Sequence, residues 1–199
     1  GYVRNRVRYP GPKLPRSEVL ATLRARVGDA TVPVDSADDI ERLCGSGASD
    51  RFALSDSGSG ITPDRWLPTL ARADFFLCPP GIVMPMCHNV IEAMAVGTIP
   101  LIEYGEWFHP NLAHMRNCIA FDGKDDLVAK MRLALSMPQA QVEAMRANVI
   151  GYYEQYLRPG VVVWTIEARP ERYLTLLLHT ELNMARNASK LNRHSVIIK

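Results

Sequence analysis

The sequence predicts an α/β fold, in which a parallel, Rossmann-like sheet is flanked by helices. Short apolar segments alternate along the chain with longer segments whose apolar residues recur at helical spacing, and such alternation is typical of parallel sheets. The 199 residues, 47% of them hydrophobic, suffice for one domain with a buried core. We expect this domain over residues 1–159 and a C-terminal helix and tail over 160–199.

The individual elements follow from local patterns. The segment 17–26 consists of good helix formers and is ended by Gly28, and Pro63 suits the first position of a helix over 63–72. Beyond Pro159 the pattern fits a strand or a linker over 161–166 and an amphipathic helix over 170–186. Apolar segments predict strands at 31–34, 51–55, 74–78, 98–102 and 117–121, and helical spacing predicts helices at 36–44, 86–96, 127–135 and 142–156.

Composition excludes several classes of protein. A net charge of only +2 with high apolar content excludes overall disorder, and no stretch approaches the roughly 20 apolar residues of a membrane span. We find no recognisable signal peptide, which favours a reducing compartment. No Asp-x-Asp pair occurs, so no metal is expected. The four cysteines lack CxxC spacing and are expected to be buried free thiols: Cys44, Cys78, Cys87 and Cys118.

The N-terminal segment is basic. Residues 1–16 contain five basic side chains and no acidic one: Arg4, Arg6, Arg8, Lys13 and Arg16. Three interpretations remain open, namely a nucleic-acid-binding arm, a site for a smaller anion such as a phosphate, and a solvated chain end. The segment lacks interleaved aromatic motifs and is followed by an acidic patch over 35–41, so we expect no nucleic acid as partner.

The loop after the strand at 74–78 is the first candidate binding site, because open α/β sheets bind ligands beyond the carboxyl ends of their strands. Prolines and Gly81 fix this loop, which leads into a helix start near 87–89. Free N–H groups there, with His88 and Asn89 among them, suit an anion such as a diphosphate. Glu92 falls one turn inside the helix, where a carboxylate can accept hydrogen bonds from the vicinal hydroxyls of a ribose.

The segment Pro80-Gly81, followed by His88-Asn-Val-Ile-Glu-Ala-Met-Ala-Val-Gly-Thr-Ile-Pro-Leu-Ile102, resembles the donor-binding segment of GT-B glycosyltransferases, in particular the exostosin-like group. The match covers about residues 74–103. The resemblance implies that Glu92 binds the ribose of a nucleotide sugar and that Gly97 permits close packing of helix and strand. It further implies that groups around Tyr104 contact the base and that basic residues reach the donor phosphates, the candidates being Arg8, Lys13 and Arg16.

Two departures from the family pattern limit what the resemblance implies. Many retaining members carry a second Glu about eight residues before the ribose Glu, where this chain has Met84-Pro85. Whether the anomeric configuration is retained or inverted therefore stays open. The fold also needs an acceptor-binding half and a central first strand, for which this chain offers little beyond Tyr2-Val3. Because the chain starts at Gly1 without an initiator Met, we expect both upstream, together with a catalytic base that cannot be named.

The expected activity is transfer of a sugar from a nucleotide-sugar donor to a hydroxyl of a glycan or another acceptor. This chain is expected to be the donor-binding half, with the nucleotide sugar as substrate and no separate cofactor. The alternative is a non-catalytic nucleotide- or phosphate-binding module. The expected location is the cytoplasm or a membrane surface, or the Golgi lumen for a eukaryotic exostosin-like protein.

Overall fold

The structure is a computed structural model that describes residues 13–47, 50–55, 60–81 and 86–170. The chain divides into two compact units, Gly1–Arg158 and Pro159–Lys199. The first unit alternates strands and helices, which confirms the predicted α/β class. Its elements are α1 (Arg16–Arg26), η2 (Gly28–Ala30), β1 (Thr31–Pro33), α2 (Ala37–Gly45), β2 (Phe52–Leu54), α3 (Pro63–Ala71), β3 (Phe75–Leu77), α4 (His88–Ala95), β4 (Ile99–Ile102), η3 (Gly105–Trp107), β5 (Ile119–Ala120), α5 (Gly123–Leu135), α6 (Gln139–Tyr152) and the π-helical turn η4 (Tyr153–Leu157).

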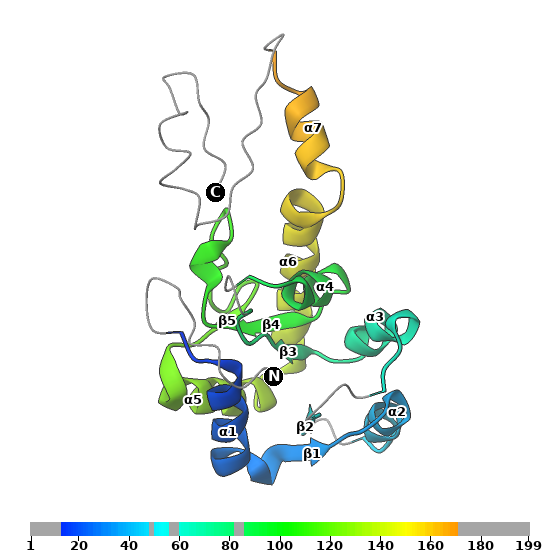
Figure 1. Ribbon diagram of the computed structural model, residues 1–199, viewed down its shortest axis with the longest axis vertical. Helices are drawn as coiled ribbons and strands as arrows, with labels where there is room; N and C mark the ends of the chain where they lie inside the picture. The colour runs from blue at the N-terminus through cyan, green and yellow to red at the C-terminus, as the bar shows by residue number, and fades with distance from the viewer. Residues whose placement is uncertain (1–12, 48–49, 56–59, 82–85, 171–199) are drawn as a thin grey trace. The chain divides into compact units, whose positions relative to one another are not determined.

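Every strand pair of the described chain is parallel, as predicted. The described strands form two small sheets instead of the single sheet that the alternation suggested (Figure 1). One sheet contains β1 and β2, and the other has the order β3-β4-β5. Helices flank both sheets, so the unit is a Rossmann-like α/β arrangement.

β4 is the centre of the three-stranded sheet, and all four of its residues are buried. Its second residue is Pro100, which has no N–H to donate. The N–H of Ile99 donates to the carbonyl of Asp74 at 2.9 Å, and the carbonyl of Leu101 accepts from Cys78 at 2.9 Å. The backbone N–H and C=O groups of Ile99 and Leu101 therefore point towards β3, and those positions of Pro100 between them point towards β5. Because the β5 pairing begins only at Leu101, opposite Ile119, the missing donor of Pro100 falls outside the ladder.

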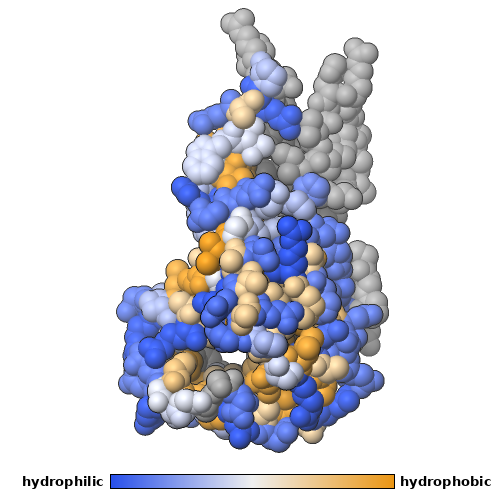
Figure 2. All heavy atoms as spheres, turned by 180° about the vertical axis from the view of Figure 1, so that it is seen from behind, coloured by the Kyte–Doolittle hydropathy of each residue, from blue (hydrophilic) through white to orange (hydrophobic). Residues whose placement is uncertain are grey.

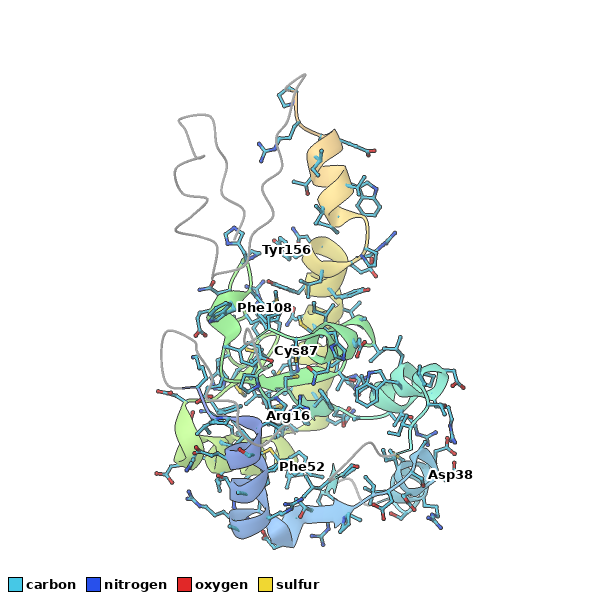
Figure 3. The ribbon with its side chains drawn as sticks, viewed as in Figure 1. Arg16, Asp38, Phe52, Cys87, Phe108 and Tyr156 are labelled. Carbon is cyan, nitrogen blue, oxygen red and sulfur yellow. The ribbon has the colours of Figure 1, made fainter. Side chains whose placement is uncertain are left out.

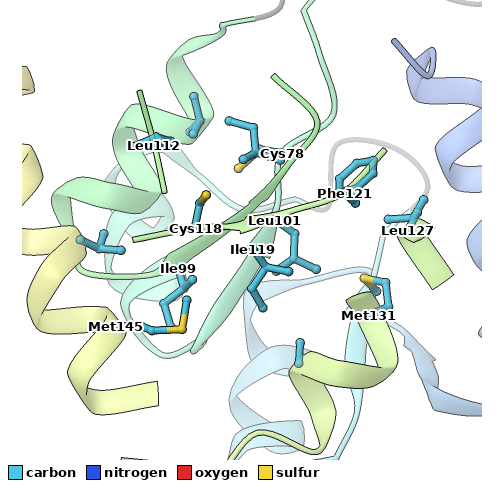
Figure 4. Packing of buried hydrophobic residues seen from close by; sticks show 14 of the residues in the cluster. Cys78, Ile99, Leu101, Leu112, Cys118, Ile119, Phe121, Leu127, Met131 and Met145 are labelled. Atoms are coloured by element: carbon cyan, nitrogen blue, oxygen red, sulfur yellow. The ribbon is translucent and has the colours of Figure 1, made fainter. Parts of the chain in front are cut away.

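The hydrophobic core lies around β4 (Figure 4). Leu127 and Met131 from α5 and Met145 from α6 contact it, and each is at most 2% exposed. A strand covered by helices has apolar residues at consecutive positions, which explains the uninterrupted apolar run of β4. Other members of this core are Val19, Leu23, Val90, Met94, Ile119 and Val149.

The second unit contains α7 (Val161–Glu167), so the prediction of a strand or linker over 161–166 is wrong. Gly160 precedes the helix in the left-handed region at φ 100°, and its carbonyl accepts the N–H of Trp164 at 2.8 Å. The valines favour a strand only where a neighbouring strand is available to pair with them. The helix predicted over 170–186 lies outside the described residues except at its first position.

A tight turn joins α4 to β4 at Gly97. Its φ is +77°, and a Cβ built there would lie 2.9 Å from Cδ1 of Ile150 on α6. Thr98 follows and is fully buried, and its hydroxyl donates to the carbonyl of Leu70 at 2.7 Å. The turn thus brings α4, α6 and the end of α3 together, and only glycine fits it.

We predict that Gly97→Ala lowers the free energy of unfolding by about 1–3 kcal/mol, because the left-handed backbone and the contact with Ile150 both oppose a Cβ. Gly151→Ala in α6 is the matched control, since its Cβ would meet nothing within 4 Å and its backbone is helical. That control should raise stability by about 0.5–1 kcal/mol. Urea unfolding measures both, and equal effects of the two substitutions would contradict the role of Gly97.

Candidate functional site

The candidate site lies at the carboxyl edge of the three-stranded sheet. Parallel strands all end at the same edge, so the connections that follow β3, β4 and β5 meet there. Figure 3 shows Cys87 at the start of α4 and Arg16 at the start of α1. Gly81 is the last described residue of the loop after β3 and is half-buried.

Within the described residues, the N-terminus of α4 has no side-chain cap. Cys87 precedes the helix in an extended conformation, and no side chain of the described ranges accepts the first N–H groups of the helix. The Cys87 thiol instead donates to Oδ1 of Asn89. His88 is exposed and Asn89 is half-buried. The helix therefore directs N–H groups and the positive end of its dipole towards this edge, and the anion site expected there stays a prediction.

Glu92 has a partner that the sequence analysis missed. The indole N–H of Trp66, in the first turn of α3, donates to Oε2 of Glu92 at 2.7 Å. The Trp66 ring lies edge-on to Phe76 of β3, with ring centroids 5.9 Å apart. Both Trp66 and Glu92 are half-buried, and within the described part of the chain no hydrogen bond reaches Oε1 of Glu92. The pairing fixes the carboxylate and leaves one oxygen available.

Trp66 could have been found from the sequence. Pro63 places a helix start directly after the connection from β2, and a helix that follows a parallel strand begins at the carboxyl edge. Trp66 is in the first turn of that helix and so belongs to the same edge as the start of α4.

Glu103, which follows β4, is buried to 4% exposure and connects three parts of the edge. Its Oε2 accepts the N–H of Leu14 at 2.6 Å, and its Oε1 accepts the N–H of Gly123 at 3.0 Å. Its backbone carbonyl accepts from Nζ of Lys13 at 2.5 Å. Glu103 thus holds the segment before α1 and the start of α5 against the end of β4.

The three basic residues predicted to contact the donor phosphates lie in different surroundings. Lys13 lies at the edge, but its ammonium forms an ion pair with Glu106 at 2.7 Å and is mostly buried. Arg16 is exposed at the start of α1. Arg8 lies outside the described residues. Tyr104 is also at the edge, yet its side chain is fully buried, so any contact with a ligand would have to come through its neighbours.

The four cysteines are free in the structure. Cys78 directly follows β3, Cys87 directly precedes α4 and Cys118 directly precedes β5. Burial, followed by the nearby thiols of Cys87 and Cys118, raises the pKa of Cys78 well above its usual value. Burial raises the pKa of Cys118 to about 12. Both thiols are therefore protonated at neutral pH and are poor nucleophiles. The expectation of buried thiols is confirmed for Cys78 and Cys118, but it is wrong for Cys44, which is exposed, and Cys87 is only half-buried.

Another hollow of the described surface carries balanced charges. A hollow of about 310 Å³ lies at the amino end of β1, with acidic and basic side chains on its wall in equal number: Asp29, Asp50, Arg51 and Arg132. Arg132 approaches Asp29 there at 3.5 Å, so the charges offset each other. Among the described residues, no group of three or more His, Cys, Asp or Glu side chains is arranged to hold a metal. Within the same residues, no helix has the length and apolarity of a membrane span.

Comparison with known proteins adds no relative: no protein-family model, no curated protein and no solved structure matches this chain.

We predict that Glu103→Gln lowers the free energy of unfolding by about 1–3 kcal/mol, because an amide has one acceptor oxygen for two buried N–H donors. Glu106→Gln is the control, since its side chain is half-exposed and bonds only Lys13 among the described residues. It should change stability by less than about 1 kcal/mol. Denaturant unfolding tests this, and a neutral Glu103→Gln would show that Glu103 does not hold the edge together.

Proposed function

We propose that the carboxyl edge of the β3-β4-β5 sheet binds the nucleoside diphosphate of a nucleotide sugar, and that this chain supplies the donor-binding part of a glycosyltransferase. The observation that carries the proposal is the pairing of Glu92 with Trp66, one turn inside a helix whose N-terminus is uncapped. The sequence resemblance of residues 74–103 to GT-B donor-binding segments supports the same assignment.

The diphosphate occupies the start of α4. Its charge is met by the backbone N–H groups and helix dipole there, with His88 as an exposed neighbouring donor. Arg16 is the best basic candidate for a further phosphate contact, because it is exposed at the start of α1. Lys13 contributes less, because Glu106 already balances its charge.

The ribose lies against Glu92. Trp66 uses Oε2 as its acceptor and leaves Oε1 for a ribose hydroxyl, in a half-buried position where a charge-assisted hydrogen bond is strong. A helical turn rises about 5.4 Å, so Glu92 lies about one turn along the helix from the N–H groups proposed to bind the phosphates. This separation of acceptor and donors matches a ligand with hydroxyls at one end and phosphates at the other.

In the transfer step, an acceptor hydroxyl of a glycan or another molecule attacks the anomeric carbon of the sugar. The bond from that carbon to the diphosphate oxygen breaks, and the hydroxyl proton passes to a base that we do not assign within the described residues. The N–H donors at α4 stabilise the negative charge that develops on the leaving diphosphate. This chain's contribution is thus to hold the donor and favour departure of the diphosphate.

We predict that Glu92→Ala weakens binding of UDP or GDP, whichever the protein binds, by about 10- to 100-fold, the expected loss for a hydrogen bond to a charged group. Glu143→Ala is the matched control, because Glu143 is exposed on α6. It should leave affinity unchanged. Isothermal titration calorimetry measures both, and an unchanged affinity in Glu92→Ala would contradict the ribose assignment.

We predict that Trp66→Phe weakens the same binding by about three- to tenfold, because the hydrogen bond that orients Glu92 is lost while the aromatic contact with Phe76 is kept. In a Glu92→Ala background the substitution should have no further effect, since Trp66 acts through Glu92. A full additional loss in the double variant would show that Trp66 contacts the ligand independently.

A further inference from the structure

A histidine ring closes part of the outer side of β5. Phe121 donates its N–H to the carbonyl of Ile102 at 3.1 Å and so faces β4. The backbone groups of successive strand residues point to alternate sides, so those of Ala120 point away from β4. On this outer side the N–H of Ala120 donates to Nδ1 of His114 at 3.1 Å.

His114 lies in a tight turn over residues 113–117 that rests on β5. Asn117 closes the turn, because its Oδ1 accepts the N–H of Ala113 at 2.7 Å and its own N–H donates to the Ala113 carbonyl at 3.1 Å. The N–H of Met115 donates to the carbonyl of Cys118, just before β5, at 2.9 Å. Met115 has a left-handed φ of 60°, which is unfavourable for a residue with a side chain. The contacts with β5 therefore hold the turn in a strained conformation.

Only a neutral imidazole can make the contact with Ala120. Nδ1 accepts through its lone pair, so the ring proton of His114 must lie on Nε2. A second proton on Nδ1 would place two N–H donors opposite each other, and the hydrogen bond would be lost. Figure 2 shows hydrophilic side chains over much of the face that it presents, as is usual where a surface meets water. His114 is exposed at the protein surface, so its ring exchanges protons with the solvent.

Two charged side chains of α5 act on the ring. Burial of part of the ring, followed by the ammonium of Lys130, lowers the pKa of His114 below its ordinary value of 6.5, and the carboxylate of Asp126 opposes this shift. Lys130 and Asp126 themselves form an ion pair at 3.6 Å. The folded protein thus binds a proton at His114 less readily than the unfolded chain. The contribution of the neutral ring to stability is therefore present above about pH 6.5 and is lost as the pH falls below that value.

We propose that His114 is a pH-sensitive switch on the outer side of β5. The neutral ring holds the turn over residues 113–117 against the strand, and protonation of the ring releases the turn and opens this side of β5. Acidification within the range of about pH 8 to 5, where histidines titrate, thereby loosens the connection from β4 to β5. The inference does not depend on the proposed nucleotide site, to which His114, Met115 and Ala120 are not assigned.

NMR spectroscopy of the full chain between about pH 8 and pH 5 tests the proposal. At the upper end, the ring ¹⁵N shifts of His114 should place the proton on Nε2. The amide shift of Ala120 should follow the titration of the ring, with a midpoint below 6.5. After correction for the intrinsic pH dependence of exchange, the hydrogen-exchange protection of Ala120 and Met115 should fall by about fivefold or more on acidification. The protection of Phe121, which is bonded to β4, should not fall.

Two variants separate the role of His114 from other effects of pH. His114→Asn keeps a polar side chain but cannot titrate, so the protection of Ala120 and Met115 should no longer depend on pH. His109→Asn is the matched control, because His109 is exposed on the same connection from β4 to β5. This variant should keep the pH response of the unmodified chain.

Three results would overturn the proposal. A ring proton on Nδ1 at about pH 8 would leave the N–H of Ala120 without His114 as its acceptor. A pH response that persists in His114→Asn would assign the effect to another group, such as Asp126. Loss of protection at Ala120 alone, with Met115 still protected, would show that the ring leaves the strand without releasing the turn.

Discussion

The buried carboxylate of Glu103 is the contact on which the carboxyl edge depends. It accepts one N–H from the segment before α1 and one from the start of α5, and it follows directly after the fully buried β4. Such a group is stable in the interior only when its oxygens are satisfied, and here both are. The two N–H donors come from segments on either side of β4 in the sequence, so a single side chain fixes how the connections around the edge are arranged.

This arrangement changes which residues are free to meet a ligand. Lys13 is drawn towards Glu106 and the Glu103 carbonyl, so its charge is largely used within the protein. The uncapped start of α4 and the carboxylate of Glu92 are left facing the same edge, one as donor and the other as acceptor. The proposed nucleotide site therefore relies more on the backbone N–H groups at the start of α4 than on the basic side chains of residues 1–16.

The local patterns of the sequence were sufficient for the α/β class, the parallel direction of the strands and most helix positions, because periodicity and caps are local. They were insufficient to show the hydrogen-bond partners of Glu103 and Trp66, which lie 89 and 26 residues away. They were also misleading for Val161–Glu167, where β-branched residues form a helix after Gly160. The separation of the described strands into two sheets had no local signal, because strand pairing joins segments that lie far apart in the sequence. The sequence correctly predicted a helix that begins near residue 88 and contains Glu92. The ligand of this site stays a prediction.

A ¹H–¹⁵N NMR titration of the intact chain with UDP and, separately, GDP tests nucleotide binding at the carboxyl edge. We expect one of the two nucleotides to shift the backbone amides of His88 and Asn89 together with the indole N–H of Trp66. The amides of Ala30 and Arg51, at the amino edge, should stay unchanged. Shifts confined to the amino edge, or no shift with either nucleotide at millimolar concentration, would contradict it.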